Sequence, residues 1–338
     1  MTNKSRHRGY FFILGFLIIL LTILDLTLGS VKIPAVDILK HIFNSGHLSE
    51  QHLIILKSFR IPRIITAFLA GSALSVCGLQ MQTLFRNPLA GPYVLGISSG
   101  ASFGAALVVL GFGTTGFLAG WGMAFAAWIG AGMVMVLLLI VSIRIKQVTT
   151  ILILGIMFSS GLAALISIMQ FFSEASALKS FVIWSMGSLG NVTQAQLIIL
   201  LLIVVPGLIA TLSSIKILNG LMLGEEYAAT MGMRIVRSRI MIFATTSILA
   251  GTITAFCGPI GFIGIAVPHI TRFTLNRADH RILLPATILV GIIIMLLSDI
   301  ISQLPGSDRV LPINAVTSLI GIPVVIWLVL KSRKNAIR

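Results

Sequence analysis

Long apolar segments separated by short polar joints run through almost the whole chain. Each has roughly 20 residues, the length at which an α-helix crosses the hydrocarbon core of a bilayer. The pattern predicts ten membrane-spanning helices, at residues 10–29, 61–83, 92–111, 117–143, 149–172, 195–213, 240–257, 260–275, 282–303 and 311–330. The predicted fold is therefore all-α, a polytopic membrane protein in which residues 1–338 form a single domain.

The composition of the chain excludes a soluble globule. Hydrophobic residues make up 57% of the sequence and charged residues only 10%, too few to cover a surface that faces water. The formal net charge is +15, which in a soluble protein would suggest a nucleic-acid partner. Here the basic residues lie in the joints between apolar segments and are not interleaved with aromatic residues. We therefore expect the lipid bilayer, and no nucleic acid, as a partner.

The distribution of basic residues predicts which side of the membrane each joint faces. An even number of spans places both termini on one side. With the termini in the cytoplasm, 17 of the 24 Lys and Arg residues lie inside, in agreement with the positive-inside rule. The basic start and the apolar run at 10–29 resemble a signal peptide, but the run is long and no clean cleavage site follows it. We expect a retained first span and an orientation with both termini inside.

Two predicted outside segments have patterns of their own. Apolar residues recur at helical spacing within residues 30–59, which predicts a surface helix there. The second span is expected to begin at Arg60–Arg63, because a proline such as Pro62 is tolerated in the first turn of a helix. Residues 173–194 are expected to form an outside loop, with Trp184 as a candidate anchor at the membrane interface.

An internal repeat divides the chain into two halves. The pattern Ala-Gly-x-x-x-x-x-Cys-Gly occurs at 70–78 and again at 250–258, and each copy is followed by a region broken by Gly and Pro. The two copies lie on spans that cross the membrane in opposite directions. Inverted repeats with broken helices at matching places are typical of transporters. The halves are predicted at about 61–172 and 240–330, joined by a cytoplasmic coupling region at 215–239.

The coupling region contains the sequence NGLMLGEEYAATMGMRIVRSR at residues 219–239. A short helix over residues 224–231 is predicted, because Glu225 and Glu226 favour the positive end of a helix and Gly232 suits its end. Two interpretations stay open on the residues alone. The segment is either a solvated loop between two spans or a docking helix for a partner protein.

Neither a metal site nor a nucleotide site is predicted in this chain. Cys77 and Cys257 lie inside apolar segments and are expected to be buried thiols without a disulfide. The six histidines are scattered and make no ligand cluster. The phosphate-binding pattern Gly-x-x-x-x-Gly-Lys-[Ser/Thr] does not occur in the sequence. We expect no cofactor and no enzymatic activity in this chain, so that any work by ATP is done in another chain.

From Arg60 onward the chain resembles the FecCD-type permeases of bacterial ABC importers, a family that includes cobalamin, ferric-siderophore and haem permeases. The matching segments are RIPR (60–63), RNPLAGPYVLGISSGAS (86–102), WSMGSL (184–189), LGEEYAATMGM (223–233), GPIGFIGIAVPHITR (258–272), DHRILLPA (279–286) and LPINAVTSLIGIPVVIWLVL (311–330). The resemblance implies ten spans with both termini inside, in the bacterial cytoplasmic (inner) membrane. It also implies a second permease subunit in a homodimer, two cytoplasmic ATPase subunits that bind ATP and Mg, and an extracytoplasmic substrate-binding protein.

The same resemblance assigns roles to three groups of residues. The helix that couples to the ATPase corresponds to Leu223, Gly224, Glu225, Glu226, Ala228, Ala229 and Gly232. Contacts with carboxylates of the binding protein correspond to Arg60 and Arg63. Family members often carry another Arg shortly after the acid of span nine, whereas Asp299 is followed here by Ile-Ile-Ser-Gln, which leaves Arg309 as the candidate. The gate and pathway candidates are Asn87, Pro88, Leu89, Thr149, Ser167, Gln170 and Phe171.

The expected function is therefore the permease subunit of a binding-protein-dependent ABC importer. Its expected cargo is an iron–siderophore chelate or a related haem or cobalamin compound. An ion-coupled secondary transporter stays open as the alternative, because the inverted repeat alone would also fit it. Such transporters usually bind ions at charges within the membrane. The deep segments here contain almost none, and Asp25 and Asp299 lie near span ends.

Overall fold

The computed structural model describes residues 2–29, 31–42, 48–111, 121–145, 147–303 and 310–336, and the regular structure in this part of the chain is entirely helical. The helices are α1 (Thr2–Thr27), α2 (Ala35–Ile42), α3 (Glu50–Ile55), the π-helix η1 (Leu56–Arg60), α4 (Ile61–Leu84), α5 (Ile97–Ala106), the π-helix η2 (Leu107–Gly111), α6 (Trp121–Arg144), α7 (Val148–Phe172), α8 (Ala175–Ser185), α9 (Gln194–Ser213), α10 (Ile215–Met222), α11 (Glu225–Thr230), α12 (Ile235–Cys257), α13 (Ile263–Leu275), α14 (His280–Ser302) and α15 (Ile313–Ala336). The all-α prediction is confirmed.

Seven helices among the described residues are long and apolar enough to cross a membrane. They are Arg8–Thr27, Glu50–Leu84, Trp121–Arg144, Thr149–Phe172, Gln194–Ser213, Ile235–Cys257 and His280–Ser302. The predicted third, eighth and tenth spans also lie on helices, but their described apolar parts are shorter. The protein is thus a multi-pass membrane protein, and a total of ten spans stays a prediction.

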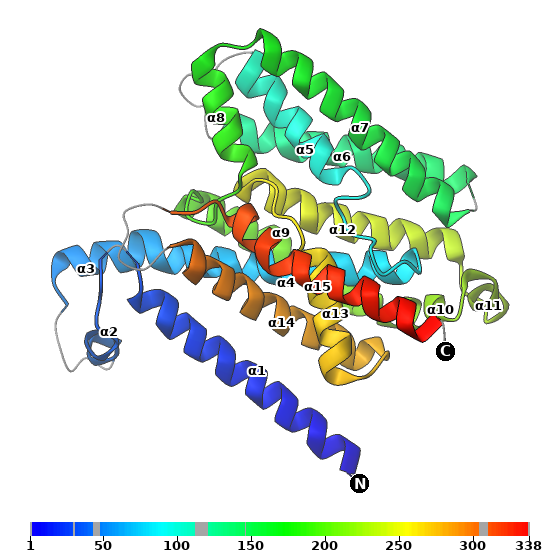
Figure 1. The fold of residues 1–338 in the computed structure, drawn as a ribbon, viewed down its shortest axis with the longest axis horizontal. Coiled ribbons are helices and arrows are strands. Elements are labelled where there is room, and N and C mark those ends of the chain that lie inside the picture. The colour runs from blue at the N-terminus through cyan, green and yellow to red at the C-terminus, as the bar shows by residue number, and fades with distance from the viewer. Residues whose placement is uncertain are drawn as a thin grey trace.

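Both ends of the chain lie at the same end of the helix bundle. Figure 1 shows the N- and C-termini at the right-hand ends of the long helices, on the side that also carries α10 and α11. Helices α2, α3 and α8 lie at the opposite end. The shared side agrees with an even number of spans, and it places the coupling region beside the termini. Which side faces the cytoplasm stays a prediction from the distribution of charge.

The helix contacts repeat between the two halves. When α4, α5, α6 and α7 are matched with α12, α13, α14 and α15, the packing of α4 on α14 corresponds to that of α12 on α6. The pair α4–α13 likewise corresponds to α12–α5, and α5–α7 to α13–α15. In Figure 1, α4 and α12 run in opposite directions. The inverted internal repeat that the sequence predicted is therefore present in the packing of the helices.

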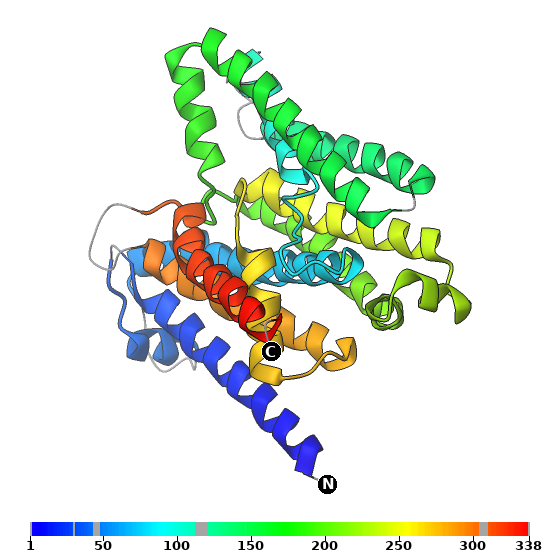
Figure 2. The same cartoon turned by 45° about the vertical axis from the view of Figure 1, so that its right-hand side comes forward.

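Two layers of helices meet along α12. Figures 1 and 2 show α5, α6, α7 and α8 as a lobe beside the bundle that contains α1, α4, α13, α14 and α15. The bundle is densely packed, and 89% of the most apolar window of Glu50–Leu84 is buried. The corresponding window of α7 is only 11% buried. The core of the protein thus lies around α4, whereas α7 presents a long apolar face.

Glycines let backbones touch where the helices of the core cross. A Cβ atom added at Gly78 would lie 1.6 Å from the carbonyl oxygen of Gly264, and one at Gly71 would lie 2.4 Å from that of Gly291. The glycines of α5 behave in the same way, since a Cβ at Gly104 would lie 2.0 Å from the carbonyl oxygen of Ala126. Close approach of this kind strengthens van der Waals packing between helices in lipid.

Two predictions for the outside segments need correction. The surface helix is present as α2, but the second span does not begin at Arg60. Its helix begins at Glu50, where the Ser49 hydroxyl accepts a hydrogen bond from the His52 N–H, and it continues through η1 into α4. The π-turn in η1 shifts the backbone hydrogen bonds, and the helix passes Pro62, which has no N–H to donate. Residues 173–194 are likewise not a simple loop, because α8 lies within them.

Replacing Gly78 with Ala should destabilise the protein through backbone overlap between α4 and α13. We expect a loss of about 1–3 kcal/mol in the free energy of unfolding, seen as a lower melting temperature in detergent by size-exclusion chromatography with fluorescence detection. Gly161→Ala is the matched control, because nothing lies within 4 Å of a Cβ built on that helical glycine. Equal melting temperatures for the two variants would contradict the close helix crossing.

Candidate functional site

The predicted coupling helix is present as α11, and a glycine lies at each end of it. Gly224 precedes the helix with a φ of 109°, a conformation that side chains with a Cβ rarely adopt. After the helix, the Gly232 N–H donates to the Ala229 carbonyl (2.9 Å) and the Met233 N–H donates to the Ala228 carbonyl (3.0 Å). These two bonds form a Schellman motif. The helix is therefore a short rigid unit with defined ends.

One of the two glutamates of α11 forms an ion pair within the protein. The Arg239 Nε donates to Glu225 Oε1 at 2.8 Å, and Arg239 Nη2 donates to Glu225 Oε2. Arg239 is buried near the start of α12, and its Nη1 also donates to the Ile145 carbonyl at 3.1 Å. Ile145 follows the end of α6 and precedes α7. The Arg239 guanidinium thus connects the coupling helix to the joint between α6 and α7.

The outer face of α11 is free for a partner. Glu226 is exposed and forms no ion pair with any described residue. Around it, the apolar side chains of Leu223, Tyr227 and Met231 are also exposed, whereas Ala228 is fully buried. A single carboxylate within an exposed apolar patch is the composition expected of a protein docking site. Of the two interpretations of this segment, the structure favours a docking helix.

The candidate gate residues form a tight turn that is fixed to α13. The Asn87 side-chain oxygen accepts from the Leu89 N–H at 2.9 Å, and the Pro88 carbonyl accepts from His269 Nε2 on α13 at 2.7 Å. Leu89 itself is exposed. The segment then runs past α7, where a Cβ added at Gly155 would lie 3.0 Å from the Leu95 Cα. The gate turn therefore lies against α13, and the segment that follows it reaches the first half of α7.

The other pathway candidates lie along α7. Thr149 is exposed in its first turn, and Ser167 is exposed with its hydroxyl donating to the Ala163 carbonyl of the same helix. Gln170 is half-buried, and the side chain of Phe171 is 82% exposed. No hydrogen bond between described residues joins Thr149 to the gate turn. These residues share one helix but stay candidates for a pathway.

The C-terminal turns of α4 carry three buried polar residues whose role the sequence did not predict. Gln80 accepts from the hydroxyls of Thr245 and Thr246 on α12, at 3.2 and 3.1 Å. Gln82 donates to the Ile265 carbonyl at 3.1 Å and accepts from Arg272 Nη1 at 2.7 Å, both on α13. Thr83 pairs with His280 on α14 at 3.0 Å. The Gln-Met-Gln-Thr sequence inside an apolar span was the available signal, since polar residues in spans face the protein interior.

At the opposite end of the bundle, the predicted docking arginines are not free. Arg60 is buried, and its guanidinium donates to the carbonyls of Leu26 and Val31. Arg63 forms an ion pair with Asp299. Its Nε lies 2.9 and 2.8 Å from the two carboxylate oxygens, and its Nη2 lies 2.7 Å from one of them. Both arginines are therefore engaged within the chain, and their contact with the binding protein stays a prediction. Arg309 lies outside the described residues.

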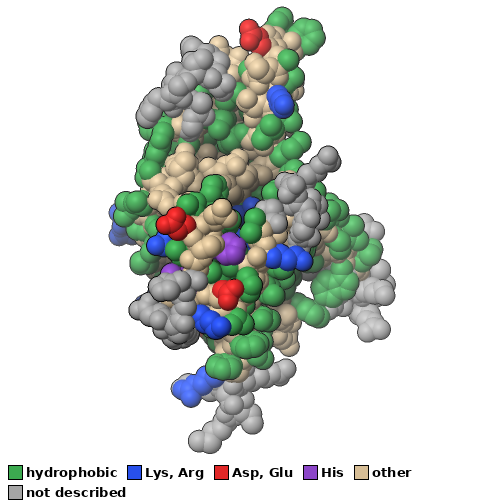
Figure 3. Space-filling view, turned by 90° about the vertical axis from the view of Figure 1, so that its left-hand side faces the viewer, with side chains coloured by type: hydrophobic (Ala, Val, Ile, Leu, Met, Phe, Trp, Pro, Cys, Tyr) green, Lys and Arg blue, Asp and Glu red, His purple; other side chains and the backbone are tan. Residues whose placement is uncertain are grey.

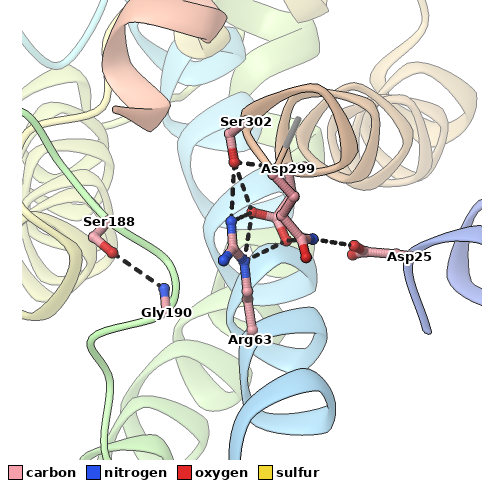
Figure 4. A network of polar contacts seen from close by, with 7 residues as sticks. Asp25, Arg63, Ser188, Gly190, Asp299 and Ser302 are labelled. Carbon is pink, nitrogen blue, oxygen red and sulfur yellow. Dashed lines mark hydrogen bonds and ion pairs between the residues drawn. The ribbon is translucent and has the colours of Figure 1, made fainter. Parts of the chain in front are cut away.

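Asp299, near the end of α14, is fully buried. Figure 4 shows Arg63, Asp299 and Ser302 converging in one network, with Asp25 of α1 beside them. Gln303 donates to Asp25 at 2.6 Å and bridges the two acids. The network joins α1, α4 and α14 and pairs the buried Asp299 carboxylate with a cation, whereas Asp25 Oδ2 has no hydrogen-bond partner among the described residues. Figure 3 accordingly shows charged side chains scattered singly over this end of the molecule.

A cavity of about 360 Å³ lies at the same end, between the starts of α6 and α9, α8 and the end of α12. Ser180, Asn191 and Gln196 contribute polar groups to it, and Phe256 contributes an apolar wall. The buried Trp184 Nε1 has no hydrogen-bond partner among the described residues. Trp184 is half-buried in the wall of this cavity, a position that the sequence did not predict. The described residues contain no group of three or more His, Cys, Asp or Glu that could hold a metal ion.

Comparison with known proteins matches nearly the whole chain. The model of the FecCD transport family matches residues 17–331. The chain is 34% identical over 324 residues to the hemin transport system permease protein HmuU of Yersinia pestis, which covers 95% of this chain and 96% of the relative. It is 35% identical over 333 residues to the vitamin B12 import system permease protein BtuC of Salmonella paratyphi A, with 98% of each chain covered.

Solved structures give the same result for the fold. A metal-chelate type ABC transporter in an inward-facing conformation matches with a TM-score of 0.85 and 29% identity, over 96% of this chain and 99% of that chain. PsaBC from Streptococcus pneumoniae, in complex with Fab, matches with a TM-score of 0.55 and 18% identity, over 83% of this chain and 94% of that chain. The second similarity extends to the fold alone.

Removing the Arg63 side chain should destabilise the fold before it affects any partner. Arg63→Ala leaves the Asp299 carboxylate buried without its cation, so we expect a loss of about 3–5 kcal/mol in the free energy of unfolding. Thermal melting in detergent measures this loss of stability. Arg63→Ala combined with Asp299→Asn should recover part of the loss, whereas Lys57→Ala, at an exposed position, should change little. An Arg63→Ala protein that melts like the wild type but no longer binds its partner would restore the docking assignment.

Proposed function

This chain belongs to the FecCD transport family, and we propose that it is the membrane subunit of a bacterial importer for a metal chelate of the haem, cobalamin or ferric-siderophore class. The support is similarity over nearly the full length to permeases named for hemin and for vitamin B12. The cargo is a large, already chelated compound, so the permease needs no metal ligands of its own. The expected location is the cytoplasmic (inner) membrane.

The observation that carries this proposal is the geometry of α11. A six-residue helix between the two halves exposes an apolar patch with one acid, while its second acid is held by Arg239. A helix fixed in this way transmits a push without bending. We assign the push to cytoplasmic ATPase subunits, which bind ATP and Mg, one beneath each of two permease subunits. The hydrogen bond from Arg239 to the Ile145 carbonyl would transmit this displacement to the start of α7.

The long apolar face of α7 supports pairing with a second permease subunit. Its exposed side chains include Ile168, Phe171 and Phe172, a larger apolar surface than pathway lining alone requires. In a homodimer, two such faces would enclose the translocation pathway, with Ser167 and Gln170 as its polar lining. Asn87, Pro88 and Leu89 would close that pathway at the end where α11 lies, beside Thr149.

The binding protein is expected to dock at the end that carries α2, α3 and α8. Arg60 and Arg63 are engaged internally, so they would stabilise the structure of this end. Direct contacts with the binding protein would then be made by exposed neighbours such as Lys57 and by Arg309. The alternative of an ion-coupled transporter is disfavoured, because Arg63 and Asp299 neutralise each other and leave no open site between them. Uptake that survives ATP depletion but collapses with the ion gradient would favour that alternative.

Charge reversal at the two adjacent glutamates should separate docking from folding. We expect Glu226→Lys to reduce the ATPase subunit retained in mild detergent by about tenfold or more, with an unchanged melting temperature, since the side chain contacts no other described residue through its charge. Glu225→Lys should instead lower the melting temperature, because it places a second cation beside buried Arg239. Affinity purification of the chain, followed by quantification of the bound ATPase, measures the first effect.

The control for this experiment is the wild-type chain with and without its ATPase subunits. Both variants must reach the membrane fraction for the comparison to count. ATP-dependent uptake into proteoliposomes, tested with haemin, cobalamin and a ferric hydroxamate, then identifies the cargo. A wild-type chain that never retains an ATPase subunit, or a Glu226→Lys protein with normal uptake, would refute the proposed role of α11.

A further inference from the structure

Helix α10, which precedes the coupling helix, packs on the core through Leu218 and Leu221 and forms hydrogen bonds to α14 through Asn219. The Asn219 side-chain oxygen accepts from the His280 backbone N–H at 2.9 Å and from His280 Nδ1 at 2.8 Å. Its Nδ2 donates to Asp279 Oδ1 at 2.8 Å. Asp279 also accepts from the Arg281 N–H at 3.0 Å and thereby caps the start of α14. The Arg281 and Asn219 donors lower the pKa of Asp279, so that it remains a carboxylate acceptor.

The imidazole of His280 extends this contact to α4. The ring is fully buried, and its Nε2 lies 3.0 Å from the hydroxyl of Thr83. Because the Asn219 carbonyl oxygen only accepts, the network assigns the proton to Nδ1. The Thr83 hydroxyl also lies 2.8 Å from the Leu79 carbonyl of its own helix, so its hydrogen is shared between that carbonyl and Nε2. His280 is thus a neutral bridge with one nitrogen bonded to α10 and the other to α4. Gln80 adds a second bond between the same elements, since its Nε2 donates to the Ser214 hydroxyl at 3.3 Å.

The gate turn comes a few residues after this contact along the chain. Thr83 lies four residues before Asn87 along the chain, and the Asn87 N–H donates to the Gln82 carbonyl at 3.2 Å. At the other side, α10 packs on the coupling helix, where a Cβ at Gly220 would lie 3.9 Å from the Ala228 Cβ. An uninterrupted series of hydrogen bonds and packed side chains therefore runs from α11 through α10 and His280 to the gate turn.

We propose that His280 is a positioning residue that holds α10 to the end of α4, so that α10, α11 and the gate turn move as one body. This inference rests on the proposed function, because the movement starts where the ATPase subunit pushes on α11. It goes beyond that function by assigning the path from the coupling helix to the gate. The bridge is uncharged and enclosed, and breaking it leaves buried polar groups unsatisfied. Displacement of α10 therefore moves the end of α4 with it.

A substrate-independent labelling experiment tests this path. The probe is a membrane-impermeant fluorescent maleimide that reacts with Leu89→Cys in the gate turn, in the permease assembled with its ATPase subunits. The native Cys77 and Cys257 are buried, so they contribute little background. We expect ATP with vanadate to change the labelling rate of this protein by at least about fivefold, and that of its Thr83→Val derivative by less than about twofold.

Matched variants separate a positioning role from a merely structural one. Thr83→Val removes the hydroxyl that faces His280. Thr271→Val makes the same change at a buried threonine whose hydroxyl donates to the Val267 carbonyl of its own helix. We expect Thr271→Val to keep the full nucleotide response. His280→Leu should lose the response while retaining the bound ATPase subunits and their hydrolysis, and His280→Gln, which can still reach Thr83, should recover part of it.

The outcomes also distinguish this inference from the proposed function. A protein with Leu89→Cys alone that binds no ATPase subunit, or shows no response to nucleotide, overturns the proposed function and this inference with it. A normal response in both Thr83→Val and His280→Leu overturns only the inference. An equal loss in Thr83→Val and Thr271→Val, with equally lowered melting temperatures, also overturns it, because both hydroxyls then act through stability.

Discussion

Every polar group that these helices carry into the bilayer must find its partner inside the protein, because lipid offers no hydrogen bonds. This constraint determines where the structure is rigid. Polar residues near both ends of α4 bond to other helices. At one end Arg63 pairs with Asp299, and at the other Gln80, Gln82 and Thr83 bond to three different helices. Between them the helix is largely buried and packs through glycines, so α4 acts as the fixed axis of the fold.

The two ends of the axis serve different purposes. Arg63 and Asp299 bind α14 to α4 through a paired, buried charge, and Gln303 connects Asp25 of α1 to this pair. The pair resists opening, since breaking it leaves an uncompensated charge. At the end that carries α11 the bonds of α4 are mostly neutral, and a neutral bond costs less to rearrange. Movement is therefore expected at the end that carries α11, with the end that carries Arg63 as the stationary support.

Much of the architecture could be predicted from the sequence. Runs of apolar residues located the helices, and the repeated Ala-Gly and Cys-Gly pairs revealed two halves whose packing is indeed equivalent. The ends of α11 followed from Gly232 and the paired acids. What could not be predicted was the partner of each polar side chain. Arg63 and Asp299 are separated by 236 positions, and nothing local to either residue indicates the other.

The same limit explains why the internal contacts of Arg60 and Arg63 were not predicted. An Arg beside Pro62 reads as the start of a helix, and helix starts usually face water. The helix instead continues from Glu50 through a π-turn, which brings Arg60 and Arg63 inside the outer end of the bundle. Glu225 and Glu226 show the converse. Two identical neighbours in sequence take opposite roles, because only the first lies on the side of α11 that faces Arg239.

The lobe of α5, α6 and α7 is the part of the molecule that we expect to move most freely. It joins the bundle chiefly along the contact of α6 with α12, and α7 is covered over only a small part of its surface. Arg239 joins α11 to this lobe through its ion pair with Glu225 and its hydrogen bond to the Ile145 carbonyl. Under the proposed function, a push on α11 would reach both sides of the pathway at once. It would arrive at α7 through Arg239 and at the gate turn through the end of α4, so that the two walls of the pathway would respond to a single displacement.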